Sequence, residues 1–129
     1  MSRSKTIPPG VRQFLLAHID SVPALETLLI MRSDGRPDWT AEEIATRTYL
    51  DTSQALGVLA TLVRAGLVSH QSSEGKYRLS LKDEAQRALL DEVANAYKTH
   101  LIQMATLIHG KAPSAVNEFA RAFELKKDR

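Results

Sequence analysis

Apolar residues recur at helical spacing in the first part of the chain. The stretch "VRQFLLAHI" predicts a short amphipathic helix over residues 11–20, because its apolar residues share one helical face. A second helix follows in "VPALETLLIMRS", with Ser21 as its N-cap and Pro23 in its first turn. The inward-facing positions predicted for the two helices are Val11, Phe14, Leu15 and Ile19, then Leu25, Leu28, Leu29 and Met31.

A capping box predicts the start of a third helix. It follows a turn at residues 34–37 ("DGRP") and a short extended piece at residues 38–39. The hydroxyl of Thr40 is expected to accept from the backbone of Glu43, while the side chain of Glu43 reaches back to the amide of Thr40. We expect this helix to end near Thr48.

The next stretch predicts a fourth helix that stops at a glycine. Asp51 or Thr52 suits its N-cap, and Gly66 suits a left-handed stop. The tight turn between the third and fourth helices leaves them flanking one another. The predicted inner face of the fourth helix consists of Ala55, Leu56, Leu59, Leu62 and Val63.

Two extended runs, "LVSHQ" and "KYRLS", flank the turn sequence "SSEG" and predict a β-hairpin. Alternation along the second run places Tyr77 and Leu79 inward, with Lys76 and Arg78 outward.

The rest of the sequence predicts one long helix over residues 81–108, capped by Ser80 and Asp83 and closed by Gly110, and a last helix from Pro113 and Ser114. The long helix carries two apolar stripes, which is more than it needs to cover a small core, so one stripe is expected to face a partner. One stripe runs along positions 85, 89, 93 and 96; the other consists of Leu90, Tyr97, Leu101 and Ile108.

Length and composition bound the class of protein. A chain of 129 residues can bury one core, with 43% hydrophobic and 25% charged residues. No run approaches the roughly 18 apolar residues of a membrane span, and the N-terminus lacks the apolar core of a signal peptide. There are no cysteines, which excludes disulfides and thiolate metal sites and suits the cytoplasm.

The order of elements across residues 22–80 resembles the winged helix-turn-helix of bacterial transcription regulators, broadly of the MarR type. The resemblance is carried by "DWTAEEIATRTYLDTSQALGVLATLVRAGLVSH". It implies a mainly α fold with a small β-hairpin, in which helical extensions flank the winged helix-turn-helix. The expected division is an N-terminal arm and helix at 1–20, the winged helix-turn-helix at 21–81, and a C-terminal helical extension at 82–129.

This resemblance implies a set of DNA contacts. The fourth helix would lie in the major groove, where the amide of Gln54 suits two hydrogen bonds to an adenine edge. Thr40 and the first amides of its helix would hold a phosphate. The residues expected to face DNA are Thr52, Ser53, Gln54, Gly57 and Thr61. The basic residues expected to contact phosphates are Arg47, Arg64, Lys76 and Arg78.

Each of these assignments has a structural alternative. Thr40 and Thr52 are also explained as helix caps alone. The four basic residues are also explained as solvated surface. Trp39 and Tyr77 are expected in the core or in strand pairing rather than as stacking platforms.

The pattern departs from the family at two places. Gly57 costs roughly 1 kcal/mol in a helix interior relative to alanine, so either another backbone or a sugar-phosphate chain approaches there, or the position is unselected. The turn of the hairpin carries Glu74 and no arginine. Residues 21–81 hold six basic and seven acidic residues, so the winged-helix region is about neutral.

No catalytic or metal-binding constellation is present in the sequence. The four histidines fall in different predicted elements, and the six glycines form no phosphate-binding loop. The sequence predicts neither an enzyme nor a metal site nor a cofactor.

Two functions remain. The first is a transcription regulator that binds double-stranded DNA as a homodimer through residues 11–20 and 82–125, although these helices can instead pack on each other within one chain. The second is a protein-interaction module with weak or no DNA binding, in which Gly57, Val58 and the long helix bind a protein partner.

Overall fold

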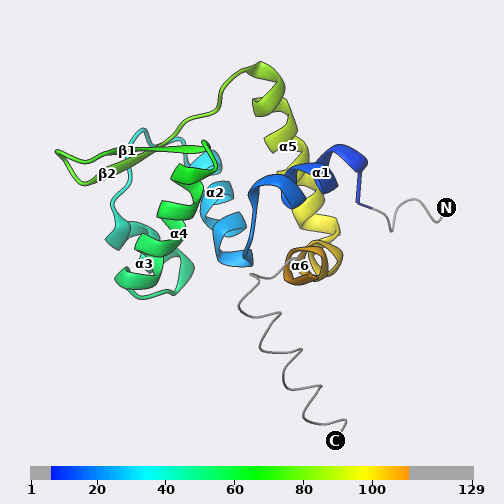
Figure 1. Cartoon of the computed structure of the whole chain (residues 1–129), viewed down its shortest axis with the longest axis horizontal. Helices are drawn as coiled ribbons and strands as arrows, with labels where there is room; N and C mark the ends of the chain where they lie inside the picture. Colours follow the sequence, from blue (N-terminus) through cyan, green and yellow to red (C-terminus); the bar gives the residue numbers. More distant parts are fainter. Residues whose placement is uncertain (1–6, 111–129) are drawn as a thin grey trace, which may run out of the picture.

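The computed structural model describes residues 7–110, and within them the chain forms helices and one two-stranded antiparallel hairpin. The helices α3 and α4 and the hairpin lie on one side of the molecule, α1, α5 and α6 lie on the other, and α2 lies between them (Figure 1). The elements in chain order are α1 (Pro9–His18), α2 (Val22–Asp34), α3 (Ala41–Thr48), α4 (Thr52–Arg64), β1 (Val68–Gln71), β2 (Lys76–Leu79), α5 (Glu84–Thr99) and α6 (Leu101–Gly110).

Side-chain hydrogen bonds begin α2 and α3 where the sequence predicts. Ser21 Oγ accepts the amide of Ala24 at 3.2 Å and caps α2. At α3, Thr40 Oγ1 accepts the amide of Glu43 at 3.1 Å, and Glu43 Oε1 accepts the amide of Thr40 at 2.9 Å. The predicted capping box is therefore confirmed. Gly66, with φ of 80°, supplies the left-handed turn after α4.

The hairpin gains a third extended segment at Trp39. The strands pair Val68 with Leu79 and His70 with Tyr77. On the other side of β2, the amide of Trp39 donates to the Tyr77 carbonyl at 2.8 Å, and the Tyr77 amide donates back at 2.7 Å. Both rings are buried, which confirms the prediction that Trp39 and Tyr77 serve the core and strand pairing.

One apolar core joins the two sides of the molecule. The helix α2 packs against α3, α4 and β2, while α1 packs against α5 and α6. Within residues 7–110, no single helix is long and apolar enough to cross a membrane. The helices α1 and α2 satisfy that criterion only as a pair, bent by 112° at their junction.

The single long helix predicted over residues 81–108 is wrong, because the helix breaks at His100. This residue has φ of −127° and ψ of 33° and ends α5. Its carbonyl then accepts the amide of Met104 at 2.9 Å within α6. The break redirects the chain so that α6 packs on α1 and buries Met104 and Ile108 completely. The last helix predicted from Ser114 lies outside the described residues.

The predicted inner face of α4 is also wrong at one position. Leu56 is 46% exposed, whereas Ala55, Leu59 and Leu62 are fully buried. Successive residues of an α-helix lie about 100° apart around its axis, so Leu56 points well away from the direction set by Ala55.

Candidate nucleic-acid interface

One face of α4 is exposed along the length of the helix. From Ser53 to Arg64 these residues follow one another at steps of three or four positions, with Leu56 and Gly57 as neighbours on the two sides of the row, so they share the face opposite the buried one. They are Ser53, Leu56, Gly57, Ala60 and Arg64, and we call this row the α4 stripe.

The start of α4 is held by a second capping box. Asp51 Oδ1 accepts the amide of Gln54 at 2.7 Å, and Gln54 Oε1 accepts the amide of Asp51 at 3.1 Å. Asp51 is therefore the N-cap, and Thr52 is the first helical residue. The capping bond uses one of the two lone pairs of Gln54 Oε1, and the NH₂ group remains a donor. Two hydrogen bonds to an adenine edge would have to share Oε1 with this capping bond or replace it.

Gly57 lies in open space. A Cβ built at this position would meet no atom within 4 Å. Its carbonyl accepts from Thr61 Oγ1 at 3.1 Å, and Arg64 Nη2 donates to the same hydroxyl at 3.3 Å. Packing within the described residues therefore does not require glycine here.

Two of the four predicted phosphate-contacting residues pair with carboxylates. Arg78 donates from both Nε and Nη2 to Asp38 Oδ1, at 3.0 and 2.8 Å. The guanidinium of Arg47 lies 3.6 Å from Asp34 Oδ2. These ion pairs neutralise charge that a phosphate would otherwise attract.

The other two, Arg64 and Lys76, form no ion pair with any residue in the range 7–110. Arg64 ends the α4 stripe and is exposed, whereas Lys76 begins β2 and is half-buried. Their positive charges are the uncompensated ones of the winged-helix region.

The start of α3 is acidic. Glu42 and Glu43 both lie in its first turn. The hydrogen bond from the Thr40 backbone, assisted by Arg36 at 2.6 Å, lowers the pKa of Glu43 and keeps it charged. A phosphate at Thr40 would therefore meet two carboxylates as well as the helix amides.

An exposed aromatic residue that the sequence does not predict stands at the end of α3. Tyr49 is 96% exposed, has φ of 61°, and follows α3 directly. A non-glycine residue rarely adopts such a φ. No sequence pattern marks it, because glycine or asparagine usually occupies the left-handed position after a helix.

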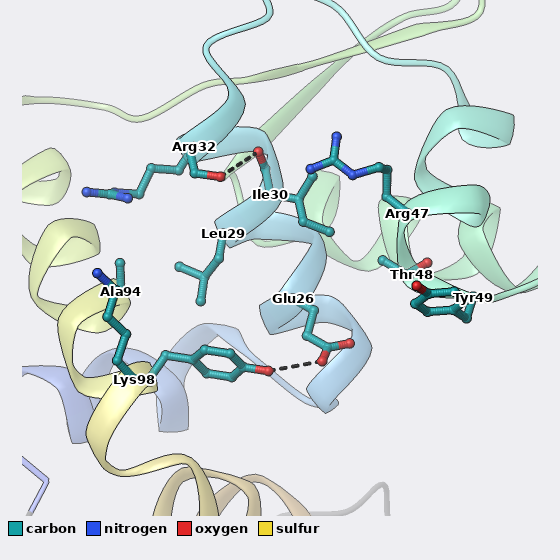
Figure 2. Close-up of a pocket in the computed structure, with 11 residues that line it drawn as sticks. Glu26, Leu29, Ile30, Arg32, Arg47, Thr48, Tyr49, Ala94 and Lys98 are labelled. Carbon is teal, nitrogen blue, oxygen red and sulfur yellow. Dashed lines mark hydrogen bonds between the residues drawn. The ribbon is translucent and has the colours of Figure 1, made fainter.

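A pocket of about 440 Å³ separates α2 from α5 beside the end of α3. Figure 2 shows Leu29 of α2, Ala94 of α5 and Thr48 of α3 around it. Tyr97 Oη donates to Glu26 Oε2 at 3.0 Å across the pocket, the dashed line at Glu26 in Figure 2. Burial, together with this bond and the negative charge of Glu26, raises the pKa of Tyr97 to about 12.

Solved structures that are similar to this chain include two proteins. The chain is similar to a MarR family protein from Bacillus stearothermophilus, with a TM-score of 0.50 and 19% identity over 92% of this chain and 80% of that one. It is also similar to CouR from Rhodococcus jostii RHA1, solved bound to p-coumaroyl-CoA, with a TM-score of 0.46 and 21% identity over 88% of this chain and 78% of that one.

No protein-family model matches the sequence, and no curated protein matches it either. The likeness to the Bacillus stearothermophilus protein extends over nearly the whole chain and shows the fold. The expected fold class, a winged helix-turn-helix of MarR type with helical extensions, is confirmed.

Proposed function

We propose that the protein is a DNA-binding transcription regulator and not an enzyme. In this proposal α4 enters the major groove, and the hairpin follows the adjacent sugar-phosphate backbone. The observation that carries the proposal is the exposed α4 stripe, which ends at Arg64. Lys76 on β2 is the other cation of the winged-helix region without an ion pair.

The proposed contacts divide into two groups. Thr52, Ser53, Gln54, Gly57 and Thr61 face the bases, with Gln54 offering its NH₂ group. Arg64 and Lys76 bind phosphates directly. Three further residues already have partners within the protein, namely Arg47, Arg78 and Thr40. They bind a phosphate only if it replaces these partners or binds beside them.

The protein is further proposed to act as a homodimer through its terminal helices. Ile102 is 73% exposed, Leu101 44% and Leu16 39%, although α1 already packs on α5 and α6 in the same chain. Exposed apolar side chains on α1 and α6 favour burial against a second copy. A dimer would present two α4 helices to two half-sites one helical turn of DNA apart.

The proposal is tested by selecting sequences from a random duplex library with the full-length chain at low salt and measuring fluorescence anisotropy on the product. We expect a selected sequence that binds far more tightly than scrambled DNA. Arg64→Ala and Lys76→Ala should each weaken binding to all sequences and reduce its salt dependence, because they remove phosphate contacts. Lys98→Ala, which removes an exposed lysine of α5, is the matched control. Equal, weak binding to every duplex would overturn the proposal.

A further inference from the structure

The α4 stripe is apolar at its centre. Between Ser53 and Arg64 it presents Leu56, Gly57 and Ala60, all exposed and none able to donate or accept a hydrogen bond from its side chain. A helix that reads bases mainly by hydrogen bonds would carry amide or charged side chains at these positions.

The polar groups beside the stripe are partly engaged within the protein. Gln54 Oε1 accepts the amide of Asp51, and the hydroxyl of Thr61 bonds both the Gly57 carbonyl and Arg64. The hydrogen-bonding capacity left for base edges is therefore small. Discrimination along the middle of α4 must then come largely from shape and apolar contact.

One base edge in the major groove is apolar. Thymine carries a C5-methyl group there, while cytosine presents a hydrogen-bond donor and purines present acceptors at N7. Leu56 and Ala60 offer methyl groups that suit this contact. Gly57 between them lacks a Cβ, and the open space around it lets the backbone of α4 approach the groove closely.

Resting on the proposed DNA binding, we infer that the α4 stripe recognises thymine C5-methyl groups, so that the targets are rich in A·T pairs under α4. Leu56 is the principal specificity-determining residue, and Gly57 sets the depth to which the helix enters the groove. Arg64 at the end of the stripe and Lys76 at the start of β2 supply the attraction to DNA that an apolar row lacks.

The test uses the unmodified protein and the duplex obtained by selection. Each thymine of a half-site is replaced in turn by uracil, which removes the C5-methyl group and leaves base pairing intact. We expect about a fourfold loss of affinity at each contacted thymine, the factor that burial of one such group contributes to a binding constant. A 5-methylcytosine placed where cytosine weakens binding should recover part of the loss.

A variant then assigns the methyl contact to Leu56. Leu56→Ala should weaken binding to the thymine duplex and bring the thymine-to-uracil affinity ratio close to one at its contact position. Lys98→Ala, which removes an exposed lysine of α5 that is not among the apolar side chains proposed to meet a second copy, should leave this ratio unchanged.

The outcomes separate the inference from the proposed function. The inference is overturned if binding is sequence-specific but unaffected by every uracil substitution. It is also overturned if the selected half-sites have no thymine under α4. In both cases the proposed function still stands. If Leu56→Ala keeps the thymine-to-uracil affinity ratio of the unmodified protein, the assignment of the methyl contact to the α4 stripe is overturned. The stripe would then be available to a protein partner. Failure to bind any duplex specifically overturns both.

Discussion

Arg78 directs two of its nitrogens at one oxygen of Asp38, with Nε at 3.0 Å and Nη2 at 2.8 Å. The two residues are forty positions apart in the sequence. They meet because Trp39, next to Asp38, pairs with Tyr77, next to Arg78. The outward-facing arginine of the hairpin is thus held by a carboxylate of the same chain.

Asp38→Asn should therefore strengthen DNA binding. The substitution frees the charge of Arg78 for a phosphate, and one added phosphate contact steepens the dependence of log affinity on log salt by about 0.9 for each winged-helix unit. Anisotropy titrations at several salt concentrations measure both the affinity and this slope. Because the ion pair is partly exposed, stability should change by about 1 kcal/mol or less.

Asp91→Asn is the matched control for this experiment. It releases Arg32, which lies 2.8 Å from Asp91 between α2 and α5 and is not one of the proposed DNA contacts. An unchanged salt slope in Asp38→Asn, or an equal increase in both variants, would argue against phosphate binding by Arg78.

The parts of the fold predicted correctly from sequence are those set by neighbouring residues. The capping box of Thr40 and Glu43 and the stop at Gly66 each depend on backbone groups within a few positions. A second signal of the same kind is present at the start of α4. Asp51 and Gln54 also stand three apart, and this spacing marks Gln54 as a capping residue as well as a candidate for base reading.

The parts that sequence could not predict depend on contacts between distant segments. Nothing at His100 marks a break, since neither glycine nor proline stands there, yet α5 ends at this residue and α6 packs on α1. Likewise, the pairing of Arg78 with Asp38 follows from the bridge at Trp39, which no local pattern reveals. The sequence therefore could not show that Arg47 and Arg78, two of the basic residues predicted to contact phosphates, are already paired with carboxylates.

Substitutions at Thr40 separate capping from phosphate binding. Thr40→Ala should cost about 1 kcal/mol in the free energy of unfolding, because the amide of Glu43 loses its acceptor. Thr40→Asp keeps a side chain that caps well but places a negative charge at the proposed phosphate site. Denaturant unfolding should show near-normal stability for Thr40→Asp, while its DNA affinity falls below that of Thr40→Ala. Equal affinities in the two variants would leave Thr40 as a cap alone.

Gly57→Ala should stabilise the folded chain by up to about 1 kcal/mol. The new Cβ meets nothing within 4 Å, and alanine has the higher helix propensity. If α4 enters the groove as deeply as we infer, the same substitution weakens DNA binding. Denaturant unfolding and anisotropy on one preparation measure the two effects. Higher stability with unchanged affinity would indicate that no partner approaches closely at this position.

Tyr97 should ionise late and should couple the stability of the protein to alkaline pH. Its pKa is raised from 10.0 to about 12, chiefly by burial and then by the bond to Glu26. The folded state thus favours the protonated phenol. Its contribution to stability is complete below pH 10 and is lost as the pH rises from about 10 to about 12. Near-ultraviolet absorbance of tyrosinate should show a late phase in the wild type that Tyr97→Phe lacks.

The same substitution tests the contact across the pocket at neutral pH. Tyr97→Phe should cost about 1 kcal/mol in the free energy of unfolding, because Glu26 loses its donor. Between pH 10 and 12 the stability of the wild type should fall more steeply than that of Tyr97→Phe, so the two curves converge. Tyr49→Phe, which alters a tyrosine that is 96% exposed, should keep the late absorbance phase. Parallel stability curves for the wild type and Tyr97→Phe across this range would show that the bond to Glu26 does not hold the proton of Tyr97.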